Sequence, residues 1–228
     1  MEILKRDSLI ESGFAGLKEH RIVKDHKVFN AKASNDRSWE GLGHFIFLAD
    51  ARYMPYGETE MHSHNELDII SVMVDGNIVH HGSLQHGTDI TANDVQVQRA
   101  GGEGFAHNEV NPDNSWNRMI QIWILPEVAG QASDYKLFKP KPGELTRVYG
   151  GNNNDNRFPA KTKVDIALLS ETQKLEINEP FIAYITRGTG VLNNQKIEDG
   201  DIIRGESLLF EATSNVQLII IHTGEGNG

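Results

Sequence analysis

The 228-residue chain contains no cysteine. This absence excludes disulfides, zinc–thiolate sites and thiol catalysis, and it leaves His, Asp and Glu as the strong metal ligands. The chain also lacks any apolar run near the roughly 20 residues that a membrane helix needs. Residues 1–7 carry no apolar signal segment. We therefore expect a cytoplasmic protein with no membrane partner.

The chain has fewer basic than acidic residues: 22 Lys and Arg against 32 Asp and Glu, which gives a formal net charge of -10. Such a surface repels phosphate backbones, so we expect no direct binding of nucleic acid. Long segments with a 3.6-residue period are missing as well, and a short stretch near 171–175 is the one weak helix candidate.

The chain instead contains short apolar runs, several of which alternate with polar residues as half-buried strands do. The Asp75-Gly76 pair lies between two of these runs and predicts a tight turn. We expect strands over 67–74, 77–80, 118–125, 181–186, 202–203, 207–210 and 216–222. The pattern predicts an all-β fold, either a sandwich or a barrel.

Two domains are expected. Residues 126–159 are dense in Pro, Gly and Asn, which marks turns and connections. We place the boundary there, with an N-terminal domain over 1–135 and a C-terminal domain over 136–228. A loose internal echo supports two similar halves, since turn signals at 75–76 and 93–94 have counterparts at 187–190 and 199–201.

Two short motifs carry the chemistry: His62-Ser63-His64 and His107-Asn108-Glu109. Side chains at i and i+2 of a strand point to the same face. If the two strands are neighbours, His62, His64, His107 and Glu109 converge on one point. Three imidazoles and one carboxylate suit one divalent transition metal ion. The alternative is a surface H-x-H pair, which is common in a chain with 10 histidines.

The segments around these motifs resemble the pirin family of bicupins. Met61 to Gly76 is similar to the family's first metal motif, Gly102 to Glu109 to its second, and Gln121 to Pro126 to the strand that follows. The resemblance implies two β-barrel (double-stranded β-helix or jelly-roll) domains packed together. The N-terminal cupin would bind the metal, and the C-terminal cupin would be metal-free, with His222 as its only histidine.

Three positions depart from the family pattern. Ser63 stands where the family usually has Pro, and Asp68 stands where it commonly has Glu. The segment 96–101 is shifted by about one residue, which we interpret as a bulge. None of these changes touches the four expected ligands, so they bear on the shape of the pocket.

The resemblance implies quercetin 2,3-dioxygenase activity, in which a flavonol is cleaved with O2 and carbon monoxide is released. The cofactor would be one divalent ion, Fe(II) first, with Mn, Ni, Co, Cu and Zn left as alternatives. The partners would be a small aromatic substrate and O2. Glu109 would accept the substrate proton, although a carboxylate bound to a cation loses proton affinity.

Two other functions stay in view. One is a non-enzymatic metal- or redox-sensing protein that binds a regulatory partner. The other is a cupin enzyme acting on another small substrate, such as a sugar isomerase, because a fold does not fix a reaction. A flat apolar pocket would favour the flavonol, and many polar donors would favour a sugar. We expect His80 and His81, which follow the first motif, to be solvent-exposed, and the alternative is that either one supports a metal ligand from behind.

Overall fold

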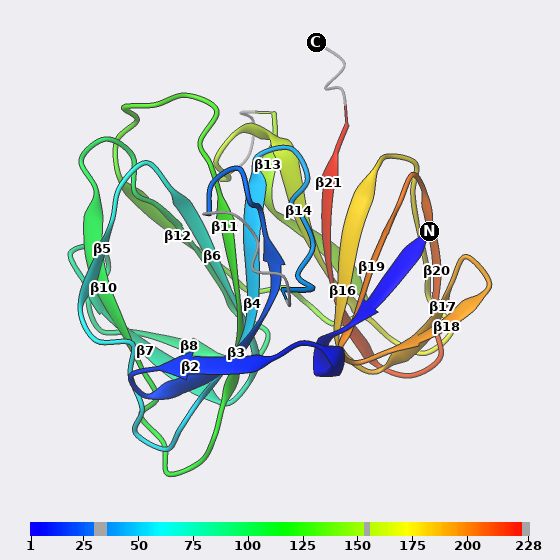
Figure 1. The fold of residues 1–228 in the computed structure, drawn as a ribbon, viewed down its shortest axis with the longest axis horizontal. Coiled ribbons are helices and arrows are strands. Elements are labelled where there is room, and N and C mark those ends of the chain that lie inside the picture. Colours follow the sequence, from blue (N-terminus) through cyan, green and yellow to red (C-terminus); the bar gives the residue numbers. More distant parts are fainter. Residues whose placement is uncertain (30–35, 153–155, 225–228) are drawn as a thin grey trace. The chain divides into compact units, whose positions relative to one another are not determined.

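The computed structural model describes residues 1–29, 36–152 and 156–224. In that part of the chain the structure consists of strands β1 to β21 and a single 3₁₀ turn, η1 (Figure 1). The predicted all-β fold is therefore confirmed. The chain divides into two compact units, one formed by Leu9–Lys139 and the other by Met1–Ser8 together with Pro140–Gly228. Nowhere in the described ranges does a helix reach the length and apolarity needed to cross a membrane.

The Leu9–Lys139 unit contains two antiparallel sheets. The larger has the order β12-β9-β6-β11-β4-β3-β2, formed by β2 (Glu11–Phe14), β3 (Leu17–Lys24), β4 (Phe45–Tyr53), β6 (Asp68–Asp75), β9 (Val95–Arg99), β11 (Arg118–Ile124) and β12 (Asp134–Phe138). The smaller has the order β5-β10-β7-β8, formed by β5 (His62–His64), β7 (Asn77–Gly82), β8 (Thr88–Thr91) and β10 (Phe105–Val110).

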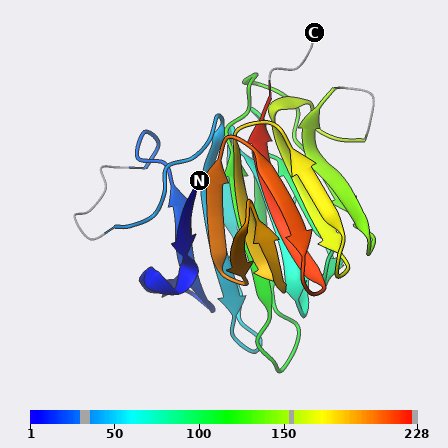
Figure 2. The ribbon, with the colours of Figure 1, turned by 90° about the vertical axis from the view of Figure 1, so that its right-hand side faces the viewer.

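The other unit repeats this arrangement, and in Figure 2 its strands run from yellow-green to red, apart from β1, which is blue. The larger sheet has the order β1-β19-β16-β21-β14-β13, formed by β1 (Glu2–Lys5), β13 (Glu144–Gly151), β14 (Ala160–Leu169), β16 (Phe181–Arg187), β19 (Asp201–Gly205) and β21 (Val216–Thr223). The smaller has the order β15-β20-β17-β18, formed by β15 (Lys174–Ile177), β17 (Thr189–Leu192), β18 (Gln195–Glu198) and β20 (Leu208–Ala212).

The strand orders of the two units correspond, except that β2 at the edge of the first unit's larger sheet has no counterpart, so the loose echo in the sequence reflects a repeated topology. The turn at Gly76 between β6 and β7 matches the turn at Gly188 between β16 and β17. Both glycines have positive φ, 72° and 86°, a conformation that a residue without a Cβ adopts without strain. β12 and β1 occupy equivalent edges, which means that the start of the chain supplies a strand that β12 supplies in the first unit.

Each unit has its own apolar core between its two sheets. In the first, Tyr53 and Met119 of the large sheet pack with Ile78 and Ile90 of the small one. In the second, a larger cluster joins side chains of both sheets; it includes Ala167, Ile185, Ile203, Leu192, Phe210 and Ile220. Packing of two apolar sheet faces is what closes a β-sandwich or jelly roll.

Several details differ from the sequence expectations. Two strands, β12 and β13, lie within the stretch expected to be connections, while residues 153–155 of that stretch lie outside the described part. Residues 1–8 pair with the second unit through η1 (Arg6–Ser8) and β1, although we had placed them in the first domain. The helix expected near 171–175 is wrong: Thr172 takes a left-handed turn (φ 73°), and Lys174 then begins β15.

Candidate metal centre

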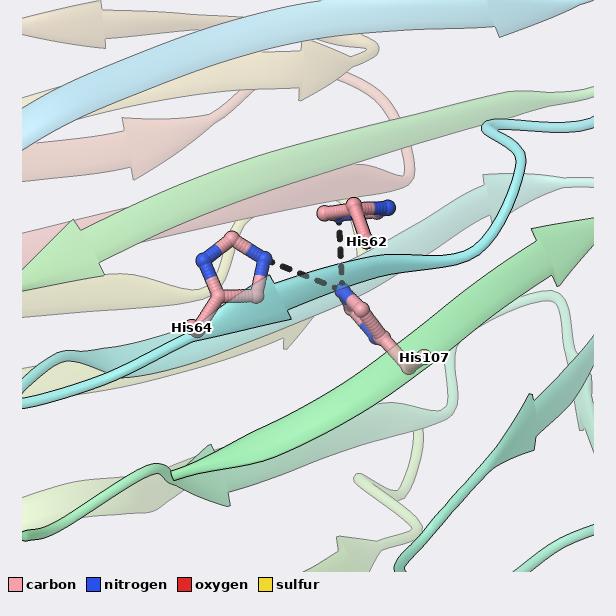
Figure 3. Close-up of side chains that lie close together, drawn as sticks. All are labelled: His62, His64 and His107. Atoms are coloured by element: carbon pink, nitrogen blue, oxygen red, sulfur yellow. Dashed lines mark hydrogen bonds between the residues drawn. The ribbon is translucent and has the colours of Figure 1, made fainter. Parts of the chain in front are cut away.

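Three histidines meet in the first unit, as Figure 3 shows. β5 pairs antiparallel with β10, which places His62 opposite His107. The Nε2 atom of His107 lies 3.1 Å from Nε2 of His62 and 3.2 Å from Nε2 of His64. These rings meet because His62 and His64 are two residues apart on one strand and share a face.

The three rings are suited to act as neutral ligands. His107 is fully buried, and His62 and His64 are half-buried. Burial lowers the pKa of His107 to about 2, with a further contribution from the neighbouring histidines. Burial, followed by the nearby His62, lowers the pKa of His64 to about 4. At neutral pH these two imidazoles are therefore uncharged, the state in which a ring nitrogen can donate its lone pair to a metal.

The wall behind His107 is shaped to accept its ring. Gly82 of β7 lies opposite His107, and a Cβ at Gly82 would come within 3.0 Å of both the His107 Cβ and the His80 Nε2. Gln98 Nε2 lies 3.4 Å from His107 Nδ1 and 3.5 Å from His80 Nδ1. Gln98 therefore lies between the rings of His107 and His80. A metal-binding histidine usually has a polar group at this place, beside the ring nitrogen that does not bind the metal.

The expectation that His80 is solvent-exposed is wrong. Its side chain is fully buried, and its Nε2 lies 2.9 Å from the carbonyl oxygen of Leu84. The alternation of β7 explains the difference, since His80 follows Ile78 on the inward face. His81 points the other way, is half-buried, and stacks on His86 with ring centroids 4.9 Å apart.

Glu109 lies on the same face of β10 as His107, but its carboxylate has different partners. One oxygen accepts hydrogen bonds from Ser71 Oγ (3.0 Å) and Gln96 Nε2 (2.7 Å). The other accepts from Tyr53 OH (3.0 Å) and Gln121 Nε2 (3.3 Å). A fully buried carboxylate needs such donors to offset the loss of water. At this site, the ligand atoms that lie within 4.8 Å of one another are those of the three histidines, without Glu109.

The pKa of Glu109 reflects two opposing influences. Burial raises it, and the hydrogen bonds from Ser71, Tyr53 and Gln96 oppose that rise in part. Burial, then the charge of Glu109, raises the pKa of Tyr53 well above its usual value. Tyr53 therefore remains a hydrogen-bond donor to Glu109 at any physiological pH.

The four donors to Glu109 were not foreseen from the sequence. The available signal was a polar residue inside an apolar run: Ser71 in β6, Gln121 in β11, and Gln96 in β9, where Gln98 is a second one. Such a residue is buried at a cost unless it has a partner. Their registers align, because Gln121 pairs with Ser71 and Ser71 pairs with Gln96 across neighbouring strands.

The departures from the family pattern have structural roles of their own. Ser63 points away from the two histidines and is exposed. Asp68 is fully buried and forms an ion pair with Arg99, whose Nη2 lies 2.8 Å from its Oδ2. The bulge expected over 96–101 is absent from β9, which pairs with β6 without a register shift from Val95 to Arg99.

A cavity of about 330 Å³ opens beside His62 and His64. Its lining is mostly aromatic and aliphatic. Phe47 and Trp123 pack with ring centroids 4.5 Å apart, and Phe29 lies 5.6 Å from Phe47. Tyr53 and Gln121, which hold Glu109, also line the cavity. A pocket of this size with a few polar groups converging on it is typical of a small-molecule site.

His222, the histidine expected to lie outside any metal site, is part of an ionic network in the second unit. Its Nε2 lies 2.8 Å from Asp165 and its Nδ1 lies 2.6 Å from Glu179. Arg147 pairs with Asp165 and Lys163 with Glu179. Burial would raise the pKa of Asp165, but the hydrogen bonds from His222 and Arg147 outweigh it and lower that pKa.

Comparison with known proteins identifies the family. The family model described as "Pirin" matches residues 26–124. A Pseudomonas aeruginosa protein named "Putative quercetin 2,3-dioxygenase PA1210" is 30% identical over 162 residues, which cover 65% of this chain and 69% of that protein. The chain belongs to the pirin family. A "Pirin-like protein" of Caulobacter vibrioides is 26% identical to this pirin over 229 residues, 86% of this chain and 98% of that protein.

Solved structures agree on the fold. The bacterial pirin YhhW of Escherichia coli, crystallised in complex with nickel(II), matches this pirin with a TM-score of 0.82 and 16% identity, over 97% of this chain and 98% of that chain. The pirin thus has the bicupin fold that its sequence predicted, with two jelly-roll units of facing sheets.

Proposed function

We propose that this pirin-family protein is a metal-dependent dioxygenase of the quercetinase type, which opens the ring of a flavonol with O2 and releases carbon monoxide. One observation carries the proposal. The Nε2 atom of His107 lies 3.1–3.2 Å from those of His62 and His64, and these two histidines line an apolar cavity of about 330 Å³. The name of the Pseudomonas aeruginosa relative points to the same activity.

The donor set fits one divalent transition metal. His62, His64 and His107 would hold it, and we assign Glu109 as the fourth ligand because it shares a face of β10 with His107. When bound, the ion would act as a Lewis acid toward the substrate's oxygens and make the flavonol reactive toward O2. We take Fe(II) first, and the same donors also accept Mn, Ni, Co, Cu or Zn.

The cavity lining favours an aromatic substrate over a sugar. Phe29, Phe47 and Trp123 offer flat apolar surface, whereas a sugar would need many polar donors. Tyr53 and Gln121 are polar groups of the lining, and both are hydrogen-bonded to Glu109. The lining therefore supports the flavonol over the isomerase alternative.

The protein's own groups would bind, orient and move one proton. The aromatic side chains hold the flavonol flat and exclude water. The substrate's 3-hydroxyl proton would pass to Glu109 when that carboxylate detaches from the ion, because a carboxylate bound to a cation loses proton affinity, whereas burial without the cation raises its pKa. Tyr53 and Gln121 keep the carboxylate in place while the proton arrives.

The test is turnover of quercetin in air by protein reconstituted with Fe(II), Mn(II), Ni(II), Co(II) or Cu(II) in parallel. Loss of flavonol absorbance and release of carbon monoxide are followed together. We expect metal-dependent turnover that disappears in Glu109→Ala and His107→Ala. Gln217→Ala, at a buried position of the second unit, tests for general damage and should keep the activity. If no metal supports turnover in protein that binds one ion per chain, the dioxygenase proposal fails.

A further inference from the structure

The cavity has a charged side that the metal chemistry does not use. Strand β3 presents Leu17, Glu19, Arg21 and Lys24 to it. Strict alternation from Leu17 would place residue 23, not residue 24, on this face. The register shift between Arg21 and Val23 changes the alternation, so that Lys24 pairs with Phe47 of β4 and faces the cavity. The bulge thus brings a second cation to the same side as Arg21.

The cations lie across the sheet from the groups that hold Glu109. Gln121 of β11 pairs with Ala49 of β4, and Ala49 pairs with Arg21 of β3. Two strand spacings, about 10 Å, separate Arg21 from Gln121 along this row. Because Ala49 is small, the row leaves room between them. One cross-strand row further, Trp123 pairs with Phe47 and Phe47 pairs with Lys24. The two aromatic rings therefore separate Lys24 from the side of the cavity where the histidines lie.

Arg21 is held in place with part of its guanidinium free. Its Nε donates to the buried Glu19 carboxylate at 2.6 Å, which fixes one edge of the group. Its Nη atoms form no hydrogen bond or ion pair with the described residues. The Lys24 ammonium forms an ion pair with Asp36 at 3.9 Å, which is longer than a hydrogen bond. A planar guanidinium with an unused edge is suited to bind a carboxylate through two hydrogen bonds.

We propose that this cavity selects aromatic substrates that carry an anionic substituent, and that Arg21 and Lys24 are the residues that recognise it. The inference rests on the proposed function, since it assumes that the substrate's chelating end lies at the histidines. The ring of the substrate would lie against Phe47 and Trp123, and its carboxylate would reach the Nη edge of Arg21. A neutral flavonol would then bind more weakly than the preferred anionic substrate.

Binding of matched acids and esters tests the proposal. The probes are 3-hydroxyflavone carrying a carboxylate at the 4′ or the 6 position, which places the charge at either end, and the methyl ester of each. Dissociation constants are measured by tryptophan fluorescence under argon, on the Fe(II)-loaded full chain, so that no turnover occurs. We expect at least one acid to bind about tenfold more tightly than its ester, a difference of about 1.4 kcal/mol.

Variants assign the preference to residues. Arg21→Gln should bring acid and ester to equal affinity, and Lys24→Gln should reduce the preference by a smaller factor. Lys18→Gln is the matched control, because Lys18 lies on β3, is exposed and forms an ion pair with the exposed Glu11. It should keep the full preference. Should Arg21→Gln fail to fold, the half-exposed Lys24 still carries the test.

The outcomes separate this inference from the proposed function. A preference for the acid that Arg21→Gln removes supports the inference, even if neither probe causes O2 uptake when air is admitted. Equal binding of acid and ester by the wild type, or a preference that survives both variants, overturns it. O2 uptake with acids and esters at the same kcat/KM would uphold the dioxygenase and refute the selection of anions.

Discussion

Glu109 shows how one buried carboxylate organises the residues around it. Four donors, each from a different strand of the large sheet, converge on its two oxygens. Each donor would itself be costly to bury without an acceptor. The carboxylate and its donors thus stabilise one another, and each depends on the register of strands that are distant in the sequence.

Gln96→Met tests this dependence. The substitution keeps the volume but removes the 2.7 Å hydrogen bond to Glu109 and the 3.1 Å bond to Ser71. We expect the free energy of unfolding of metal-free protein to fall by about 1–3 kcal/mol, as measured by denaturant titration. Gln98→Met is the matched control, because Gln98 is equally buried but has longer contacts of 3.4–3.5 Å. This variant should lose less of the free energy of unfolding. Equal losses would contradict the special role of Gln96.

The depressed pKa of His64 has a consequence for stability. In the unfolded chain a histidine takes up a proton near pH 6.5, whereas in the folded metal-free protein His64 does so only near pH 4. The unfolded state therefore binds more protons between these values, so stability falls as the pH falls through this window. His64→Gln should give a shallower decline of melting temperature between pH 6.5 and 4. Identical slopes would show that His64 is not buried as described.

At the scale of elements, β1 is the strand whose position is least expected from its place in the chain. It pairs with β19, with Leu4 opposite Ile202, and Leu4 is buried. Lys5 pairs with Asp201 and Arg6 with Asp199. β1 thereby covers an edge of the second unit's large sheet that would otherwise expose unpaired backbone groups.

Removal of residues 2–8 should weaken the second unit. We expect a loss of about 2–4 kcal/mol, from the buried Leu4 side chain and the lost strand pairing. Hydrogen exchange of the β19 amides and denaturant unfolding would measure it. Glu2→Gln is the control, since it breaks only the exposed Glu2–Arg204 pair and should cost less than about 1 kcal/mol. Unchanged exchange in β19 after the deletion would contradict this role.

Most strands could be predicted because their apolar runs are short and end at turn residues. Val216–Thr223 and Arg118–Ile124 match the expected 216–222 and 118–125 closely. The pairing of strands could not be predicted, because it depends on contacts between distant segments. Runs buried on both faces, such as that of β6, gave no alternation to show which side chains face the cavity. The histidines were predicted by their spacing, but the partners of Glu109 needed the register.

At the scale of the molecule, the two units share a topology but not the chemistry of their small sheets. The pair equivalent to β5 and β10 is β15 and β20. There Leu208 lies opposite Ile177, in the register position where the first unit has His107 opposite His62. Leu208, Phe210 and Ala212 belong to the apolar core of the second unit. The repeated fold therefore holds polar ligands in one copy and apolar packing in the other.

Metal stoichiometry tests this asymmetry. We expect one equivalent of metal per full-length chain, retained in His222→Ala and lost in His62→Ala and His107→Ala, as measured by elemental analysis after dialysis. His222→Ala should still lower stability, because Asp165 and Glu179 lose a shared partner. Two equivalents per chain, or full retention by both variants of the first unit, would contradict the assignment.

The pairing of β1 with β19 also affects the order in which the two units can fold during synthesis on the ribosome. The unit with the three histidines is continuous in sequence, so every strand of its two sheets has been made once residue 139 emerges. In the other unit, β1 cannot pair with β19 until Ile202 has been translated. Until then Leu4 lacks its pairing partner. A strand that is made before the first unit is therefore among the last to pair, and the unit that carries the candidate metal centre can be complete before then.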